Sequence, residues 1–400
     1  MTAPPEAHLS APLRRGLTRR RFLGGVLGLG SAAAFAACST PGLEKFSVDA
    51  RAAKDRSSTQ KLVNWSNWPE YLDVNDKTQR HPSLDQFKKQ TGITVHYVED
   101  VTDNDVIFAK LKPALESGRD TGRDMVIVTD WMVERLIRLT WVQPLDHGNI
   151  PNLKNLEPSL KDVSFDPGRK LSVPWQSGFT GVAYNPKATD GVKVTSVDQL
   201  LHDKRLRGRV TLLTEMRDTV GLTMLAMGSD PSKFEEHEFY DAIDVLREAK
   251  AAGQIQGFTG NEYGQGLAAG DIAACMAWAG DVVQLRADNP KLGYTLPETG
   301  HMLWSDNFTI PNQAAHKTNA EKLIDFYYRP DIAAEVEDYV NYISPVVGAK
   351  QILLKEDPEI AENPLIFPDD KVRAKSHVFQ AVTAQQDTEF NRAFQALIGG

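Results

Sequence analysis

In the stretch that begins near residue 60, short apolar runs alternate with segments in which apolar side chains recur at helical spacing. Residues 62–64, 94–98 and 125–129 predict strands, whereas residues 83–91 and 104–116 predict helices. Strands that alternate with helices are typical of βαβ units, in which the strands pair in parallel. The pattern therefore predicts an α/β fold built around a mostly parallel sheet flanked by helices.

A further segment, residues 173–186, is long, is interrupted by glycine and closes with Asn-Pro, which predicts a strand that crosses between two lobes. Further along the chain, residues 210–213 and 270–281 predict strands, and residues 239–252 predict an amphipathic helix. Strands and a helix thus follow the crossing strand, as expected of a second α/β lobe.

The N-terminal part of the chain has the features of an export signal. Arg19, Arg20 and Arg21 stand just before a sixteen-residue run of apolar and small side chains, residues 22–37. The run is too short and too rich in Ala and Gly for a comfortable membrane span, and its basic front and small-residue exit are typical of a secretory signal. The two arginines followed by Phe-Leu resemble the twin-arginine translocation pattern.

A cysteine follows this run directly. Residues 35–38 resemble a lipoprotein processing box, in which the cysteine becomes the lipidated first residue, although Phe35 stands where such a box usually has Leu. We therefore expect residues 1–37 to be a twin-arginine-type lipoprotein signal peptide and Cys38 to carry the lipid anchor. Residues 38–59 are expected to form a tether, because the stretch before residue 60 is polar and small.

The charge of the chain indicates what kind of partner it has. The 400 residues include 45 Lys and Arg and 53 Asp and Glu, a net charge of −8. Residues 1–37 hold five Arg and one Glu, so the other 363 residues keep 40 basic and 52 acidic side chains, a net charge of −12. An acidic mature chain disfavours nucleic acid or anionic lipid as a partner and mildly favours a cation. Its length is sufficient for two lobes, each with its own core.

Cysteine usage predicts no disulfide framework. If Cys38 belongs to the anchor, Cys275 has no partner. It lies within the apolar residues 272–279, so we expect a small buried core residue and not a nucleophile.

Three aromatic rings and a carboxylate fall within the eight residues 64–71. An aromatic face attracts a positive group and a carboxylate accepts a charge-assisted hydrogen bond from it, so this composition suits an organic cation. Pro69 cannot donate to a ladder and should close a strand that ends at Asn64, which would place the cluster on a strand-to-helix loop. The rings could instead plug the top of a core, and this stretch alone favours neither interpretation.

The combination of an aromatic ring and an acid recurs at four places, each expected at a strand end. They are Trp68 with Glu70, Asp130 with Trp131, Trp278 with Asp281, and Trp304 with Asp306. Open α/β sheets bind ligands at the carboxyl ends of their strands. Each pair alone could be packing plus a helix cap, but scattered core rings have no reason to bring carboxylates with them. Two further acids, Glu215 and Asp218, lie at an expected helix start, where the helix dipole alone would explain them.

In order and spacing together, these residues resemble the polyamine (spermidine/putrescine) binding proteins that serve ABC importers, over about residues 62–368. The matching elements are Asn67-Trp68-Pro69-Glu70-Tyr71, Trp131, Glu215-Met216-Arg217-Asp218, Trp278-Ala279-Gly280-Asp281, Trp304-Ser305-Asp306 and Tyr342. Two positions depart from the family pattern: Val128-Thr129 stands where Pro-Ser is usual, and Ser177 stands where Trp is frequent. The packing around the ligand is expected to differ there.

The resemblance implies a two-lobed, hinged fold of the periplasmic-binding-protein type (type II). Residues 60–180 with 304–350 would form the first lobe, and residues 181–303 with 351–400 the second. Closure of the lobes would hold a putrescine or spermidine molecule by cation–π and carboxylate contacts. The implied ligand-binding residues are Trp68, Tyr71, Thr129, Trp131, Glu215, Asp218, Trp278, Asp281, Trp304, Asp306 and Tyr342.

The same resemblance implies a substrate-binding protein that delivers its ligand to an ABC permease, and the leader with Cys38 predicts that it is a lipoprotein. The protein would be exported, anchored by lipid on the outer face of the cytoplasmic membrane, and monomeric. No catalysis, cofactor or metal is expected.

A hydrolase and a ferric-ion receptor fit the sequence less well. An exported hydrolase would need a nucleophile elbow or a metal set, but the sequence has no Gly-x-Ser-x-Gly or His-Glu-x-x-His, and its nine His are dispersed. A ferric-ion receptor could use Tyr339 and Tyr342, although the many Trp would do nothing for a metal. A receptor for another organic cation such as thiamine stays open, because rings and acids suit any such ligand.

Overall fold

The computed structural model describes residues 53–75 and 77–399. The expected signal peptide, Cys38 and most of the expected tether lie outside these residues. In the part of the chain that the structure describes, none of the helices is both long and apolar enough to cross a membrane.

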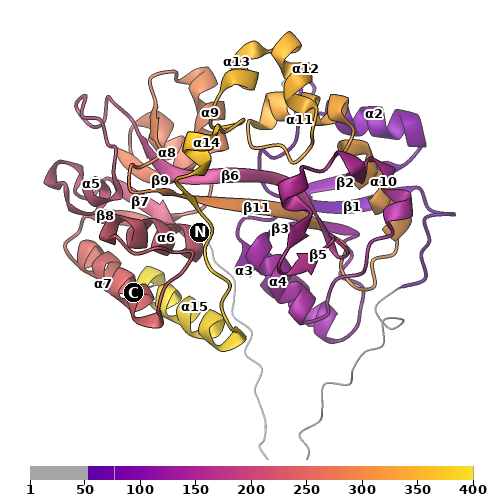
Figure 1. Ribbon diagram of the computed structural model, residues 1–400, viewed down its shortest axis with the longest axis horizontal. Coiled ribbons are helices and arrows are strands. Elements are labelled where there is room, and N and C mark those ends of the chain that lie inside the picture. The colour runs from indigo at the N-terminus through magenta and orange to yellow at the C-terminus, as the bar shows by residue number, and fades with distance from the viewer. Residues whose placement is uncertain (1–52, 76, 400) are drawn as a thin grey trace, which may run out of the picture. The chain divides into compact units, whose positions relative to one another are not determined.

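A mixed sheet runs through the protein in the strand order β2-β1-β3-β11-β6-β9-β7-β8 (Figure 1). Its strands are β1 (Leu62–Asn67), β2 (Thr94–Glu99), β3 (Met125–Thr129), β6 (Ser172–Tyr184), β7 (Val210–Leu213), β8 (Ile255–Thr259), β9 (Ala274–Trp278), β10 (Gly293–Thr295), β11 (His301–Thr309) and β12 (Ser376–His377). Strand β10 pairs with β6, and β12 pairs with β11. A small hairpin is formed by β4 (Asp162–Val163) and β5 (Asp166–Pro167).

Helices cover both ends of this sheet. They are α2 (Pro82–Thr91), α3 (Asn104–Glu116), α4 (Asp130–Arg138), α5 (Val197–His202), α6 (Met216–Met227), α7 (Glu236–Ala251), α8 (Tyr263–Ala269), α9 (Ala279–Asp288), α10 (Lys317–Tyr327), α11 (Pro330–Val340), α12 (Ala349–Glu356), α13 (Pro358–Glu362), α14 (Asp370–Arg373) and α15 (Ala384–Gly399). Short 3₁₀ turns lie at His147–Asn149, Pro151–Asn155, Pro158–Leu160 and Lys204–Leu206.

The first lobe is built around β2, β1 and β3, which pair in parallel as the alternation of strands and helices predicts. One boundary prediction is wrong: β1 does not end at Asn64 but continues to Asn67. The reason is Trp65, which is fully buried and packs its ring against Trp175, Phe308 and Tyr327. Burial of this large ring favours extension of the strand, so Trp65 belongs to the core and not to the loop cluster.

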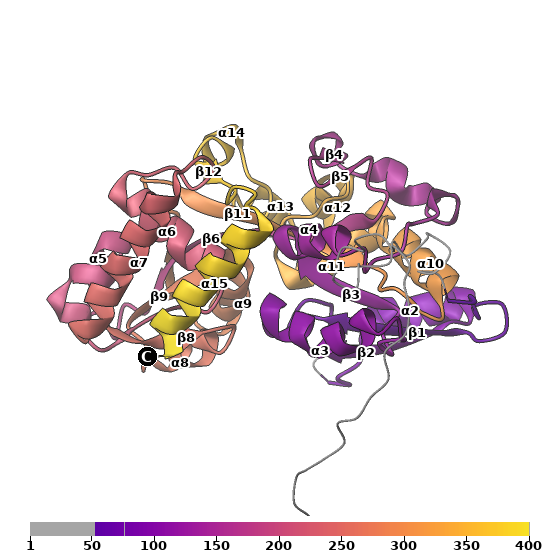
Figure 2. The same cartoon turned by 90° about the horizontal axis from the view of Figure 1, so that it is seen from below.

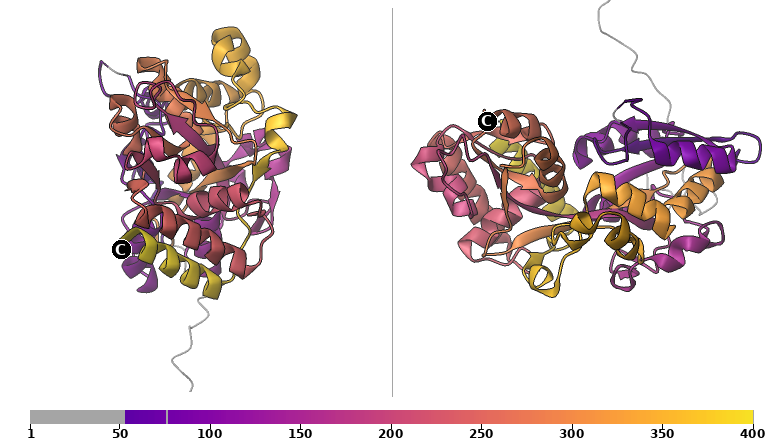
Figure 3. Two further views of the ribbon diagram at one scale, coloured as in Figure 1. Left: turned by 90° about the vertical axis from the view of Figure 1, so that its left-hand side faces the viewer. Right: turned by 90° about the horizontal axis from the view of Figure 1, so that it is seen from above.

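The second lobe is built around β9, β7 and β8, which are also parallel. Helices α5, α6 and α7 pack together on it, and the C-terminal α15 lies along α7, as Figure 2 shows. The α/β architecture with two lobes is thus confirmed, and the views in Figure 3 show the two groups of elements on either side of the central strands.

Strands β6 and β11 connect the lobes. All 13 residues of β6 are buried, as expected of a strand that crosses the centre of the molecule. It pairs antiparallel with β11 and β9, and β11 pairs antiparallel with β3. The two adjacent crossing strands therefore join the parallel halves into one sheet.

The assignment of residues to lobes stays a prediction. The expected boundary at residue 350 falls inside α12, and α12 packs against both α11 and α13. These contacts suggest that the chain leaves the first lobe after α13, before α15 reaches α7.

Candidate ligand-binding site

A cavity of about 680 Å³ lies where the two lobes meet at the crossing strands. All eleven residues that the sequence singled out for ligand binding line it. Parallel strands of both lobes end at this place, so the side chains that follow β1, β3, β7 and β9 converge there. The structure thus brings the candidates together, while their contact with a ligand remains a prediction.

Five aromatic rings form a continuous series along the cavity. Trp68 lies 6.4 Å from Trp278, which lies 6.5 Å from Trp304, measured between ring centroids. Tyr342 continues the series, 5.5 Å from Trp304 and 5.0 Å from Tyr71. Four of these rings are buried and Trp304 is half-buried. Their edge and tilted contacts leave ring faces that can hold an apolar chain or a cation.

Glycine allows these rings to approach the neighbouring backbone. A methyl group added at Gly280 would overlap the ring of Tyr342, and one at Gly178 would lie 2.5 Å from the ring of Trp304. Both positions therefore require a residue without a Cβ atom.

Asp306 is the central acid of the first lobe. The hydroxyl of Thr129 donates to its Oδ1 at 2.7 Å, and the hydroxyl of Tyr71 donates to its Oδ2 at 3.0 Å. Burial raises the pKa of Asp306 to about 7, although these two hydrogen bonds oppose the shift. The expectation that Asp306 lies at a strand end is wrong, because it lies inside β11, opposite Thr129 of β3.

Asp281 and Asp218 are the corresponding acids of the second lobe. Asp281 accepts hydrogen bonds from the hydroxyls of Tyr342 at 2.5 Å and Tyr263 at 2.7 Å, and from the Asn261 amide at 2.9 Å. Asp218 accepts from the indole N–H of Trp278 at 2.8 Å. Burial raises the pKa of both acids, in Asp218 to about 6.

Glu215 completes the acidic set. It precedes α6, and its Oε2 accepts a 3.2 Å hydrogen bond from the amide of Asn104 in the first lobe. Burial, followed by the nearby carboxylates of Asp103 and Asp218, raises the pKa of Glu215 well above its ordinary value. Carboxyl groups with raised pKa values gather in one cavity, which is an arrangement that a cation would stabilise.

Two of the other ring-and-acid pairs also differ from the expectation. The Glu70 side chain is exposed and does not line the cavity, so this pair contributes only its ring. Trp131 does line the cavity, but the guanidinium carbon of Arg217 lies 3.8 Å from its ring centre and that of Arg135 lies at 4.8 Å. The ring of Trp131 is thus engaged by cations of the protein itself.

Several residues of the site had no signal in the sequence. Tyr263 and Asn261, which hold Asp281, come from the loop and helix after β8, an element with no motif of its own. The cavity also extends past the ring series to apolar side chains from the β4–β5 region and from the segment before α15. These include Leu160, Val163, Phe165, Phe379 and Val382.

Ser177 and Cys275 are both buried in the central strands β6 and β9. Ser177, where the family often has Trp, donates to or accepts from Ser305 at 2.6 Å, so no ring fills that position. Cys275 is a free, buried thiol in β9, as expected of a core residue. Within residues 53–75 and 77–399, the His, Cys, Asp and Glu side chains form no cluster that could hold a metal ion.

Comparison with known proteins decides the family. The sequence profile of the bacterial extracellular solute-binding proteins matches residues 83–368. The chain belongs to this family. Solute-binding proteins of this kind are exported receptors of transporters and not enzymes. Membership of the family confirms the expectations that the protein is exported and that it is not an enzyme.

Individual relatives of this solute-binding protein cover nearly its whole length. It is 30% identical over 363 residues to the putrescine-binding periplasmic protein PotF of Escherichia coli (strain K12), with 86% of this chain and 93% of that protein covered. It is 28% identical over 359 residues to the spermidine/putrescine-binding periplasmic protein 1 of Haemophilus influenzae, with 90% and 93% covered. A solved structure of a spermidine/putrescine ABC transporter protein from Listeria monocytogenes superposes with a TM-score of 0.74 at 25% identity, covering 84% of this chain and 99% of that chain.

Proposed function

We propose that this solute-binding protein captures a linear polyamine, putrescine or spermidine, for an ABC importer. The observation that carries the proposal is the pairing of the aromatic series with Asp306, Asp218 and Asp281 in one cavity. In the described residues, these acids accept hydrogen bonds from hydroxyl, indole and amide groups, which are all neutral. A cavity that gathers buried acids in this way is suited to a ligand that brings the positive charge.

The binding mode follows from the shape of a polyamine. The methylene chain would lie along the rings of Trp68, Trp278 and Trp304, where apolar burial stabilises it. The terminal ammonium groups would lie near Asp306 at one end and near the acids of the second lobe at the other, with cation–π contact to the rings.

A ligand held from both sides would favour the arrangement in which the lobes contact each other. The hydroxyl of Tyr342 already donates to Asp281 across the cavity, and the amide of Gln284 in α9 donates to the carbonyl of Val340 in α11 at 2.8 Å. Only the difference in ligand contacts between the open and closed forms can shift that balance. The closed form is the one that we expect the permease to read.

The named relatives support the choice of ligand, because the two sequence relatives above are described as binding putrescine or spermidine. A receptor for another organic cation such as thiamine is the main alternative, since rings and acids also suit such a ligand. For a ferric-ion receptor, Tyr342 would have to give up its hydrogen bond to Asp281.

The deciding experiment is native mass spectrometry of protein purified without dialysis, followed by titration calorimetry with putrescine, spermidine and thiamine. We expect a co-purified mass equal to that of a polyamine, and saturable binding of putrescine or spermidine but not of thiamine. Recovery of a different organic cation, or tighter binding of thiamine than of either polyamine, would refute the assignment.

The route of export and the anchor are further proposals that rest on the sequence alone. Arg19-Arg20 supports the twin-arginine route, and Cys38 supports a lipid anchor on the outer face of the cytoplasmic membrane, periplasmic or extracellular. Two or three acyl chains on one residue exceed the single chain that binds membranes only marginally, so such an anchor would be stable. We further propose that the protein is monomeric and meets the ABC permease of its own transport system.

A further inference from the structure

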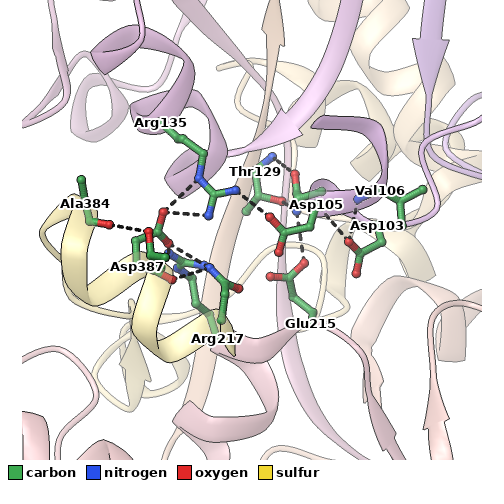
Figure 4. A network of polar contacts seen from close by, with 12 residues as sticks. Asp103, Asp105, Val106, Thr129, Arg135, Glu215, Arg217, Ala384 and Asp387 are labelled. Carbon is green, nitrogen blue, oxygen red and sulfur yellow. Dashed lines mark hydrogen bonds and ion pairs between the residues drawn. The ribbon is translucent and has the colours of Figure 1, made fainter. Parts of the chain in front are cut away.

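An ionic network joins the lobes beside the acidic cavity, and Figure 4 shows it from close by. Asp387 of α15 is at its centre. Its Oδ2 accepts hydrogen bonds from Nε and Nη2 of Arg135 at 2.9 and 2.7 Å, and its Oδ1 accepts one from Nη2 of Arg217 at 2.9 Å. The exposed fractions of these side chains are only 9% to 12%.

The three charged residues come from different lobes. Arg135 lies in α4, which follows β3 of the first lobe, whereas Arg217 lies in α6, which follows β7 of the second. Asp387 lies in α15, which packs on α7 of the second lobe. The pair Arg135–Asp387 therefore crosses between the lobes, and the pair Arg217–Asp387 stays within one.

Arg135 and Asp387, the two charges of the crossing pair, each have a second partner within their own lobe. Arg135 also pairs with Asp105 of α3, in its own lobe, at 2.6 Å. Asp387 would keep Arg217, and Arg135 would keep Asp105, if the lobes separated. Neither charge would then be buried alone, a situation that costs several kcal/mol. The crossing pair can consequently form and break with the movement of the lobes.

Asp387 is poorly placed to hold the ligand directly, although it reaches the cavity wall. Both of its oxygens accept guanidinium hydrogen bonds, and Oδ1 accepts a further one from the Asn391 amide at 3.2 Å. Burial would raise the pKa of Asp387, but Arg217 and Arg135 hold it below its ordinary value. A carboxylate that is already neutralised by two arginines has little attraction left for an ammonium group.

We propose that Asp387 is a positioning residue for ligand capture: its bond to Arg135 latches the C-terminal helix of the second lobe onto the first lobe. This inference rests on the proposed closure of the lobes around a cation. The latch adds to the stability of the closed form and makes no distinction among ligands. Its loss should therefore weaken every ligand by the same factor and act mainly on dissociation.

The test compares Arg135→Gln and Asp387→Asn with Asp105→Asn, in calorimetry and stopped-flow kinetics with putrescine and spermidine. Arg135→Gln leaves the Arg217–Asp387 pair intact, so it removes both hydrogen bonds of the latch without disturbing the second lobe. Arg138 of α4, whose Nη2 lies 3.8 Å from Oδ2 of Asp387, keeps only a longer contact. We expect about tenfold weaker binding of both ligands in the two latch variants, through faster dissociation. Asp105→Asn removes the partner that Arg135 would keep in the open form, so it should leave affinity unchanged or raise it, and it should not weaken binding. Asp387→Glu should restore part of the loss.

Three outcomes would overturn the inference. Weakening of one ligand but not of the other would mean that Asp387 contacts the ligand. An equal effect of Asp105→Asn would mean that the network only stabilises α4. Additive effects in the double variant Arg135→Gln/Asp387→Asn would mean that the two residues do not act as a pair.

Small-angle X-ray scattering of ligand-free protein separates this inference from the proposed function. The latch predicts a larger radius of gyration for Arg135→Gln than for the wild type, whichever ligand the cavity binds. An unchanged radius would count against the latch even if polyamines bind. Failure of both polyamines to bind the wild type would count against the proposed function and leave the scattering comparison as the test of the latch.

Discussion

Replacing Asp306 by Asn tests the proposed site most directly, because it removes a charge and almost nothing else. Asn has the size of Asp, and its Oδ1 can keep the 2.7 Å hydrogen bond from Thr129. Its amide nitrogen would face the Tyr71 hydroxyl, 3.0 Å away, which can accept as well as donate. The neutral contacts of the site should therefore survive.

The expected loss of affinity follows from the burial of this carboxylate. Asp306 is 4% exposed, so an ammonium bound beside it would be largely stripped of water. A hydrogen bond to a charged group contributes about 1.5–3 kcal/mol, and removal of one partner of a buried ion pair costs about 3–5 kcal/mol. Since each 1.4 kcal/mol is tenfold in the dissociation constant, Asp306→Asn should weaken putrescine and spermidine by about 100-fold to 1000-fold.

The same variant should be more stable than the wild type when no ligand is present. The pKa of Asp306 is about 7 in the folded protein and 3.8 in the reference state. The folded state thus favours the protonated form of Asp306. The stability that this group contributes is fully present below pH 3.8 and is lost as the pH rises through about 7. At pH 8 the wild type has a buried, ionised carboxylate that Asn lacks, and we expect a higher melting temperature for Asp306→Asn.

Calorimetric titration and thermal melts at pH 8 provide the measurement. Asp73→Asn is a matched control, because Asp73 is also buried, accepts from Ser83 and has a raised pKa, but it does not line the cavity. The control should bind both polyamines like the wild type. Unchanged affinity for both ligands in Asp306→Asn, with the fold intact, would end the assignment of this site to polyamines.

Further predictions concern ligand length, pH, ring packing and the anchor. Asp218→Asn should weaken spermidine more than putrescine in calorimetry, because only a chain that spans the lobes reaches it; equal losses would contradict this. Affinity for spermidine should fall as the pH drops from 8 to 5, since Asp306 and Asp218 with pKa values of about 7 and 6 bind a cation only when ionised, and a flat profile would exclude their role. Gly280→Ala should lower polyamine affinity at least tenfold by displacing Tyr342, whereas Gly257→Ala, which has no atom nearby, is its control for binding. Cys38→Ala should move the protein from the membrane fraction to the soluble fraction, and its retention in the membrane fraction would refute the lipid anchor.

The local elements were readable in the sequence because the spacing of apolar side chains is a local property. The strands at 94–98, 125–129 and 210–213 and the helix at 104–116 agree with β2, β3, β7 and α3 to within one residue. The crossing strand was also readable, from its length, its glycines and the Asn-Pro that closes it. Because the strand ends could be read locally, the residues that follow them could be named as site candidates.

Only the tertiary structure decided which of those candidates line the cavity and which residues they contact there. Trp65 and Trp68 are three residues apart, but the first packs in the core and the second lines the cavity. The pairing of β11 with β3 places Asp306 beside Thr129, and this register depends on residues 177 positions apart. Arg217 covers Trp131 because Asp387, from the far end of the chain, holds it there. Side-chain periodicity carries no information about such long-range pairings, which arise only when the lobes pack and each buried charge finds its partner.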